Sequence, residues 1–127
     1  MTETFRIPYP PTDAGRKAWN KLYGLNAIYS GKHWSKRRED AEYWHMITGA
    51  ALNRSKCRRK PFLKPVSISY GFNDRLDLSN HAYIAKMIED ALKGRVITDD
   101  SRRYVREIRY CWHNEPYIIV TVKEETE

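Results

Sequence analysis

The segment from residue 66 to residue 72 constrains the fold more than any other part of the chain. It reads Val-Ser-Ile-Ser-Tyr-Gly-Phe, so that large apolar residues alternate with small ones. Successive side chains of a strand point to opposite faces of a sheet, and this period of two therefore predicts a strand with one buried face. The rest of the chain must supply partner strands and a layer that covers that face.

Three further segments have the composition of strands. Residues 4–9 alternate in the same way before a cluster of prolines, which predicts a short strand at or near a sheet edge. Residues 104–112 and 117–123 are rich in β-branched and aromatic residues. Because only four residues separate them, we expect these two segments to form a hairpin. The acidic tail, residues 124–127, is expected to fray.

Two segments have the apolar spacing of helices. In residues 34–52 the apolar side of the expected helix consists of Trp34, Ala41, Trp44, Ile47, Thr48, Ala51 and Leu52. A second apolar stripe between residues 84 and 92 predicts another helix, capped by Ser79 or Asn80 and ended by Gly94. Residues 12–31 contain three glycines and mixed polar residues, and we expect a basic loop there with at most one helical turn.

These elements predict the fold class. The expected order is β-α-β-α-β-β, which corresponds to one small α/β (α+β) domain with a mixed β-sheet packed against two main helices. A chain of 127 residues is long enough to bury roughly two-thirds of its unfolded surface in one core, without help from disulfides or metals. We therefore expect residues 1–127 to form a single domain.

The net charge of the chain is +7, which predicts a positive field over part of the surface. A polyanion such as nucleic acid is the expected partner. The alternatives are a solvated basic surface, an acidic protein or membrane lipid. The chain has only two cysteines, no zinc-ligand spacing, no signal-like start and no stretch of about 20 apolar residues. We therefore expect a cytoplasmic protein without a membrane segment.

The basic residues form two groups that are candidates for DNA phosphate contacts. The first group consists of Lys32, His33, Lys36, Arg37 and Arg38, and the second consists of Arg54, Lys56, Arg58, Arg59 and Lys60. Such contacts position DNA without reading its sequence. Trp19 and Tyr29 are the candidates for contacts with unpaired bases, whereas the spacing of Trp34 and Trp44 favours the core. The alternative for each basic residue is an ordinary solvated side chain.

Four acidic residues stand out in this basic chain. Asp74 and Asp77 follow the strand that ends at Phe72, and Asp99 and Asp100 precede the next strand. If these two strands are neighbours, the carboxylates converge. Mg²⁺ takes oxygen ligands, usually one or two carboxylates with water and substrate phosphate, so the four residues are candidate metal ligands. The alternative is that they are ordinary polar residues of turns and loops.

The same region resembles a known family. Residues 77–80 read Asp-Leu-Ser-Asn, Lys86 follows, residues 90–92 read Asp-Ala-Leu, and residues 96–100 read Val-Ile-Thr-Asp-Asp. This order and approximate spacing resemble the signature of RusA-like Holliday-junction resolvases, which are crossover junction endodeoxyribonucleases. The resemblance is weaker in the first half, where residues 7–11 and 26–38 look like segments of phage-type members.

The resemblance implies a homodimeric endonuclease that cuts branched or duplex DNA in recombination and repair with Mg²⁺ or Mn²⁺. Carried over by position, it implies catalytic roles for Asp77, Asp100 and Lys86, and metal binding by Asp77, Asp100 and the adjacent Asp99. Ser79 stands where the family has a second metal-binding aspartate, and Asp74 is the candidate to replace that carboxylate.

Three hypotheses therefore remain open from the sequence. The first is the structure-selective endonuclease, and the second, motivated by Ser79, is a relative that binds branched DNA without cutting it. The third is an RNA-binding or protein-interaction module that shares only the fold. For Lys86 and Asp90 the plain alternative is an exposed helical ion pair, and His81 is expected to be a solvated side chain.

Overall fold

The computed structural model of the protein describes residues 1–125. In chain order its elements are β1 (Thr2–Pro8), α1 (Asp13–Tyr23), α2 (Leu25–Tyr29), α3 (Trp34–Arg54), β2 (Val66–Phe72), the 3₁₀-helix η1 (Leu78–His81), α4 (Ala82–Leu92), β3 (Val105–Trp112) and β4 (Tyr117–Glu124). The predicted fold class is confirmed: the protein is a small domain of helices and one mixed sheet. The predicted strand at residues 66–72 has the same bounds as β2.

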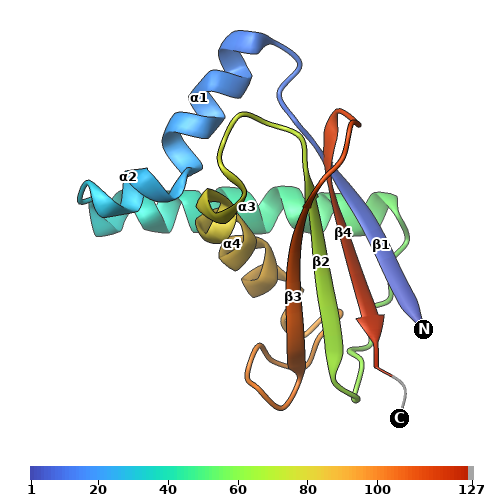
Figure 1. The fold of residues 1–127 in the computed structure, drawn as a ribbon. Coiled ribbons are helices and arrows are strands. Elements are labelled where there is room, and N and C mark those ends of the chain that lie inside the picture. The colour runs from blue at the N-terminus through green and yellow to red at the C-terminus, as the bar shows by residue number, and fades with distance from the viewer. Residues whose placement is uncertain (126–127) are drawn as a thin grey trace.

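The four strands form one sheet in the order β1-β4-β2-β3 (Figure 1). Strand β4 runs antiparallel to both of its neighbours, β1 and β2. Strand β2 runs parallel to β3. The sheet is therefore mixed, as predicted, and both β1 and β3 are edge strands.

The predicted hairpin of the last two strands is wrong. β3 and β4 lie on opposite sides of β2, and the short connection from residue 113 to residue 116 crosses the end of β2 instead of forming a hairpin turn. His113 N–H donates to the Phe72 carbonyl at 3.0 Å, and the Asn73 side chain donates to the Glu115 carbonyl at 2.9 Å. Burial explains this arrangement, since β4 buries three apolar side chains whereas most of β3 is exposed.

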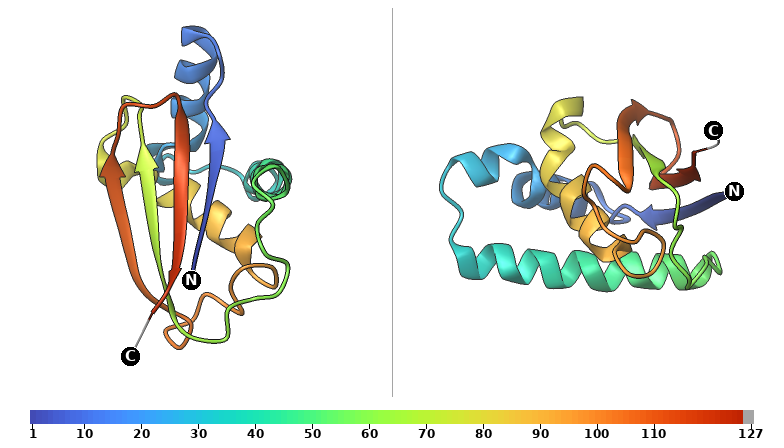
Figure 2. Two further views of the ribbon diagram at one scale, coloured as in Figure 1. Left: turned by 90° about the vertical axis from the view of Figure 1, so that its right-hand side faces the viewer. Right: turned by 90° about the horizontal axis from the view of Figure 1, so that it is seen from below.

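Helices α3 and α4 lie on the same face of the sheet (Figure 2), and the core fills the space between them. The fully buried large side chains are Trp44, Tyr70, Phe5, Phe62, Phe72, Ile7, Leu52, Ile68, Ile88, Leu92, Ile97 and Ile118. They come from β1, α3, β2, α4 and β4, except for Phe62 and Ile97, which lie in the connections between elements. The opposite face of the sheet carries no helix in this part of the chain.

The structure contains two helices, α1 and α2, where the sequence predicted a basic loop. The Thr12 hydroxyl accepts a hydrogen bond from the Gly15 N–H at 3.0 Å and caps α1. The ring of Trp19 on α1 lies 6.0 Å from that of Tyr23 and 5.0 Å from that of Trp44. The packing of this aromatic face explains the helix, because it overrides the low helix propensity of the glycines.

The apolar face predicted for α3 is partly wrong. Trp44, Thr48, Ala51 and Leu52 are buried, but Trp34 is 63% exposed and Ala41 is exposed. The N-terminal half of the helix extends past the sheet, as Figure 1 shows, so its apolar positions have no core to pack against. Asp40 is buried instead, where it accepts a hydrogen bond from the Tyr83 hydroxyl at 2.7 Å.

The C-terminal boundaries agree more closely with prediction. Helix α4 ends at Leu92, and Gly94 follows in the left-handed region at φ +79°. Glu124 is the last residue of β4, so fraying does not begin there, and residues 126–127 of the expected tail lie outside the described residues. None of the helices in residues 1–125 is both long enough and apolar enough to cross a membrane.

The packing of β2 against β4 makes a specific prediction about stability. A Cβ atom at Gly71 would lie 2.6 Å from Cγ2 of Ile119, whereas one at Gly49 of α3 would meet nothing within 4 Å. We expect Gly71→Ala to reduce the free energy of unfolding by about 1–3 kcal/mol because of overpacking. The matched variant Gly49→Ala should increase it by about 0.5–1 kcal/mol, since alanine favours a helix. Urea unfolding measures both, and equal effects of the two variants would contradict the prediction.

Candidate functional site

Lys86 and Asp100 are in direct contact, although 14 residues separate them in sequence. The Lys86 Nζ lies 2.5 Å from Oδ2 of Asp100 and 3.1 Å from Oδ1 of Asp90. Lys93 Nζ reaches the same two oxygens at 3.0 and 3.2 Å. Glu89, next to Asp90, lies 3.6 Å from the Lys86 ammonium. We call these five residues the Asp100 cluster.

The charges of the Asp100 cluster shift its protonation equilibria in a consistent way. Hydrogen bonds from Lys86, and then from Lys93, lower the pKa of Asp100 from 3.8 to about 2. The hydrogen bond to Asp100 raises the pKa values of Lys86 and Lys93. Burial raises the pKa of Glu89. At neutral pH, Lys86 and Lys93 are therefore protonated and Asp100 is ionised. Glu89 is the carboxylate of the cluster whose pKa is raised.

Asp74 belongs to a second, separate group. Its carboxylate oxygens both lie 2.8 Å from Nε2 of His81, and Oδ2 accepts a hydrogen bond from the Tyr9 hydroxyl at 2.8 Å. Nδ1 of His81 lies 2.9 Å from the Leu78 carbonyl, so both ring nitrogens lie next to hydrogen-bond acceptors. The exposed fractions of the His81 and Asp74 side chains are 0% and 3%.

The predicted solvated state of His81 is therefore wrong. Its ring stacks on Phe72 with centroids 3.8 Å apart and packs edge-on against Trp112. The sequence placed this histidine beside a polar cap, where solvent exposure is the usual state, and gave no sign that a carboxylate lies within reach. The group of Tyr9, Asp74 and His81, which we call the Asp74 network, joins β1, the end of β2 and η1.

The two aspartate pairs do not converge as the sequence predicted. Strands β2 and β3 are neighbours, as that prediction required, but they are parallel. Asp74 follows the end of β2 while Asp99 and Asp100 precede the start of β3, so they lie beyond opposite ends of the strand pair. Seven residues of β2 separate these ends, about 23 Å at 3.3 Å per residue.

The other predicted metal ligands are exposed. Asp77 and Asp99 are exposed and make no ion pair within residues 1–125, and Ser79 is exposed on η1. No group of three or more His, Cys, Asp and Glu side chains in this part of the chain is arranged to hold a metal ion. The oxygen donors nearest to the Lys86 ammonium are Asp100 and Asp90, and the sequence predicted for Asp90 only a helical ion pair with Lys86.

The two predicted basic groups lie at opposite ends of α3. The first group precedes and begins the helix, and the second follows its last turn. The helix has 21 residues, so the groups are about 30 Å apart at 1.5 Å per residue. Lys36 and Arg38 are 66% and 74% exposed and make only long contacts to Glu39 and Glu42. In the second group, Arg58 lies over the Phe62 ring at 4.0 Å and Arg59 donates to Asn53.

Lys32 does not fit the predicted phosphate-contacting role. Its ammonium forms an ion pair with the buried Asp40, donates to the Leu22 carbonyl at 2.7 Å and lies near the rings of Tyr23 and Tyr83. Its side chain is only 11% exposed. Because every one of these contacts is internal, Lys32 holds the start of α3 against α1 and α4 and is not free to grip a phosphate.

A third basic group, which was not predicted, lies next to Asp100 in sequence. Arg102, Arg103, Arg106 and Arg109 are all exposed. The signal was available, because four arginines occur within eight residues. It was missed because Arg106 and Arg109 were assigned to an ordinary hairpin strand, and Arg102 and Arg103 lie just before that predicted strand. This group lies closer to the Asp100 cluster in sequence than either predicted group.

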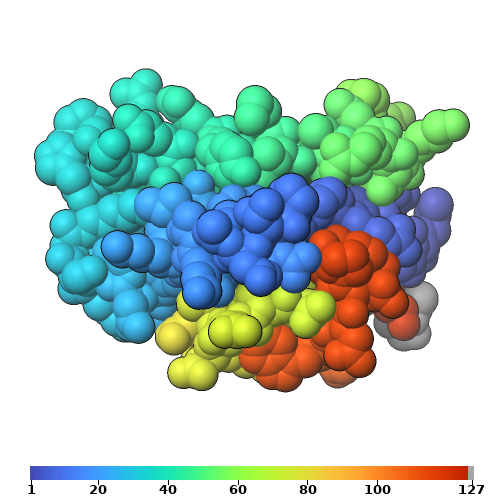
Figure 3. Space-filling view, turned by 90° about the horizontal axis from the view of Figure 1, so that it is seen from above, coloured from blue at the N-terminus to red at the C-terminus, as the bar shows by residue number. Residues whose placement is uncertain are grey.

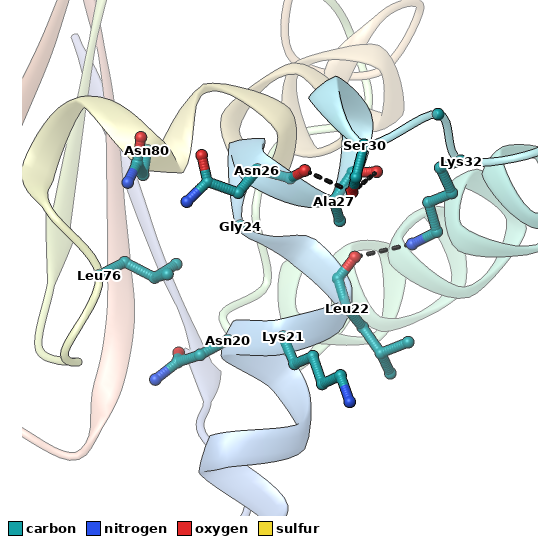
Figure 4. A pocket seen from close by; sticks show the side chains of 11 residues that line it. Asn20, Lys21, Leu22, Gly24, Asn26, Ala27, Ser30, Lys32, Leu76 and Asn80 are labelled. Atoms are coloured by element: carbon teal, nitrogen blue, oxygen red, sulfur yellow. Dashed lines mark hydrogen bonds between the residues drawn. The ribbon is translucent and has the colours of Figure 1, made fainter.

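A hollow of about 530 Å³ lies between the first two helices and residues 76–80. Figure 4 shows Asn20, Asn26 and Asn80 around it, with Leu76 on the same side as Asn80. None of the three asparagine amides has a hydrogen-bond partner within residues 1–125. A smaller hollow, lined by Arg16, Lys17, Asn73, Asp74 and Arg75 among others, lies where α1 meets the loop after β2. Figure 3 shows these two segments side by side on the surface, α1 in blue and the loop in yellow-green.

The two aromatic candidates for base contacts differ in the structure. Trp19 is partly buried and packs against Tyr9, Tyr23 and Trp44, so these contacts account for its position, and its predicted role in contacting unpaired bases stays a prediction. Tyr29 is 77% exposed beside the asparagine-lined hollow and remains a candidate. Sequence could not separate the two, because both lie in the segment whose helices were not predicted.

The Asp74 network predicts a large and specific loss of stability. Asp74→Asn removes the carboxylate that the buried His81 ring and the Tyr9 hydroxyl contact, and leaving buried polar groups without their partner in this way costs about 1–3 kcal/mol. The exposed Asp77 provides the matched control, and Asp77→Asn should change the free energy of unfolding by less than about 0.5 kcal/mol. Urea unfolding at pH 7 compares them. A fully stable Asp74→Asn protein would show that the network is not structural.

The Asp100 cluster predicts a pH-dependent effect. The folded pKa of Asp100 lies below its ordinary value, so its stabilising contribution is present above pH 4 and is lost as the pH falls toward 2. The difference in urea midpoint between the unmodified protein and Asp100→Asn should be full at pH 7 and shrink between pH 4 and pH 2. The neighbouring Asp99→Asn should show a smaller difference throughout. A pH-independent difference at Asp100 would contradict the assigned ion pairs.

Comparison with known proteins adds no family assignment. No protein-family model matches the chain, and no curated protein is significantly similar to it. The function therefore has to be argued from the residues and contacts described above.

Proposed function

We propose that this protein is a Mg²⁺-dependent, structure-selective endonuclease that cuts branched DNA, such as Holliday junctions, as a cytoplasmic homodimer. The observation that carries the proposal is the contact between Lys86 and Asp100. Both residues match the RusA-like pattern, and 14 residues separate them in sequence. If the resemblance were due to chance, we would not expect these two side chains to be in contact. They meet at a partly exposed position in a chain of net charge +7.

The donor set of the Asp100 cluster fits a hard cation. The contacts with Lys86 and Lys93 use only Oδ2 of Asp100 and Oδ1 of Asp90, which leaves the second oxygen of each carboxylate without a contact in residues 1–125. The exposed fractions of the Asp100 and Asp90 side chains are 20% and 46%. Mg²⁺ or Mn²⁺ held by these two carboxylates would neutralise charge on the scissile phosphate and acidify an attacking water.

The protein's own residues then have distinct roles. Asp100, with its lowered pKa, stays ionised and serves as a ligand, since so weak a base accepts a proton poorly near neutral pH. Lys86, with its raised pKa, stays protonated. Its ammonium is therefore suited to hydrogen-bond the phosphoryl oxygens and the leaving oxygen as the P–O bond breaks. Glu89, whose pKa burial raises, is the carboxylate best suited to take the proton from water.

The basic groups, apart from Lys32, supply the expected grip on the DNA backbone. The groups at the two ends of α3 are about 30 Å apart, close to one turn of duplex DNA, which is about 34 Å. Arg102 and Arg103 follow Asp100 after a single serine and would hold phosphates beside the cluster. Such contacts are independent of base sequence and weaken with salt. Selectivity for branched DNA would then come from shape.

The second candidate function is binding of branched DNA without cleavage. Two observations favour it: Ser79 is exposed where the family has an aspartate, and both lysines occupy the Asp100 carboxylate. A metal ion must compete with these ammonium groups for the carboxylate. A neutral hydroxyl at Ser79 cannot supply the missing charge, and Asp74 cannot compensate because it is committed to His81 and Tyr9.

Incubation with a labelled four-way junction and Mg²⁺ distinguishes the two functions. We expect cleavage by the unmodified protein and a loss of at least about 100-fold in cleavage rate for Asp100→Asn and Lys86→Gln, with junction binding retained. Asp99→Asn is the matched neighbouring control and should cleave more nearly normally. Ser79→Asp should cleave at least as fast as the unmodified protein.

The contradicting results are equally clear. Tight junction binding without cleavage, and without rescue by Ser79→Asp, would establish the binding-only function. Equal competition by linear duplex would remove the claim of structure selectivity. Full activity of Asp100→Asn would show that the Asp100 cluster is not the catalytic centre.

A further inference from the structure

The outer edge of β3 is apolar, which is unusual for an edge strand exposed to solvent. Ile108 is 45% exposed and Trp112 is 50% exposed. Their side chains lie on the same face of the sheet as α4, because Ile108 and Trp112 are in register with the buried Ile68 and Phe72. A hollow of about 180 Å³ between β3 and α4 is lined by Ala82, Ala85 and Ile108, and also by Lys86 and Glu89 of the Asp100 cluster. The apolar surface of the strand therefore meets two alanines of the helix next to these two charged side chains.

The backbone of β3 also has free hydrogen-bonding groups on this side. His113 N–H points to β2, where it donates to the Phe72 carbonyl. Because alternate residues of a strand direct their N–H and C=O groups to the same side, residues 107, 109 and 111 face β2. The backbone groups of 108, 110 and 112 then face outward. Within residues 1–125 no strand pairs with this edge, and Figure 2 shows β3 as the outermost strand of the sheet.

The charges beside Ile108 have opposite signs. Glu107 and Arg109 flank it, and both side chains lie on the open face of the sheet, in register with Ser67 and Ser69. Their side chains are 47% and 68% exposed and form an ion pair with each other along the strand. If a second copy of this strand is related to the first by a twofold axis at Ile108, each charged side chain lies opposite one of the opposite sign.

We propose that a second copy of this chain pairs with β3 in antiparallel orientation, with the twofold axis at Ile108. Glu107 then lies opposite the partner's Arg109, and Arg109 opposite the partner's Glu107. Ile108 and the partner's Ile108 form a hydrogen-bonded pair through their outward backbone groups. The charged residues form non-hydrogen-bonded pairs, whose Cα atoms are about 4.5 Å apart and whose side chains are close. The two sheets become one continuous eight-stranded sheet, twice the four strands of each copy.

Other antiparallel registers lack this complementarity. Centring the pair on Arg109 would place it against the partner's Arg109, and two like charges directly opposite destabilise a strand pair. Centring it on Tyr110 would place Arg109 opposite the partner's Cys111 and leave both ionic residues without an opposite charge. The register at Ile108 is the one that pairs both charges and also covers the exposed isoleucine.

This interface is the one through which the proposed homodimer would form. The inference therefore rests on the dimerisation in the proposed function, but it does not depend on DNA cleavage. Charge reversal tests it directly by sedimentation equilibrium of the full chain. Glu107→Arg and Arg109→Glu each create two like-charge contacts, and each should raise the dimer dissociation constant by at least about tenfold. The double variant, which exchanges the two residues, should restore dimerisation to near that of the unmodified protein. Circular dichroism verifies that each variant is folded.

A disulfide tests the register independently. In a Cys111→Ser background, Ile108→Cys places two thiols across the twofold axis with Cα atoms about 5.5 Å apart, within the range that a disulfide spans. We expect mild oxidation to give a covalent dimer. Arg109→Cys in the same background is the control and should give much less, because its neighbour across the interface is the partner's Glu107.

The outcomes separate this inference from the proposed function. A monomer at all concentrations, or a dimer that neither charge reversal weakens, would overturn the interface even if the protein cleaves junctions. Failure of the double variant to restore the dimer, or crosslinking through residue 109 in preference to residue 108, would overturn the register. Restored dimerisation with selective crosslinking at residue 108 supports both, whether or not cleavage is observed.

Discussion

The buried contact between Asp74 and His81 fixes the geometry on which the rest of the candidate site depends. It joins the loop after β2 to η1, and the Tyr9 hydroxyl ties the end of β1 to the same carboxylate. Helix α4 begins directly after His81, so this network sets where the helix leaves the sheet edge. The position of Lys86 on α4, and therefore its contact with Asp100, follows from that starting point.

Much of the fold could be predicted because its signals are local. The alternation in β2, the apolar stripe of α4 and the glycine after it depend only on neighbouring residues, and each was located to within a few residues. Strand order is not local. The length of the connection after β3 suggests a hairpin. The position of each strand in the sheet depends instead on which strand buries more apolar surface. Strand β4 buries Ile118, Val120 and Val122 and takes the interior position. The exposed β3 is left at the edge.

The candidate site was predictable to a smaller extent. Lys86 and Asp100 were selected by resemblance, and they are in contact. Asp74 was selected because it lies near Asp77 in sequence, but its carboxylate is enclosed by His81 and Tyr9, and no local pattern reveals partners from such distant segments. The predicted phosphate contact of Lys32 failed for the same reason, because its ion pair with the buried Asp40 depends on how α3 packs. The sequence gives the charge of each side chain, but it does not give the side chain with which that charge forms an ion pair.

In the proposed function the Asp100 cluster binds the metal ion, whereas the Asp74 network only supports the fold. Anomalous X-ray diffraction from crystals soaked in Mn²⁺ tests this difference most directly. We expect an anomalous peak within coordination distance of Asp100, with Asp90 as the second carboxylate. A peak at Asp74, or no peak at Asp100 when Mn²⁺ is bound elsewhere in the protein, would contradict it.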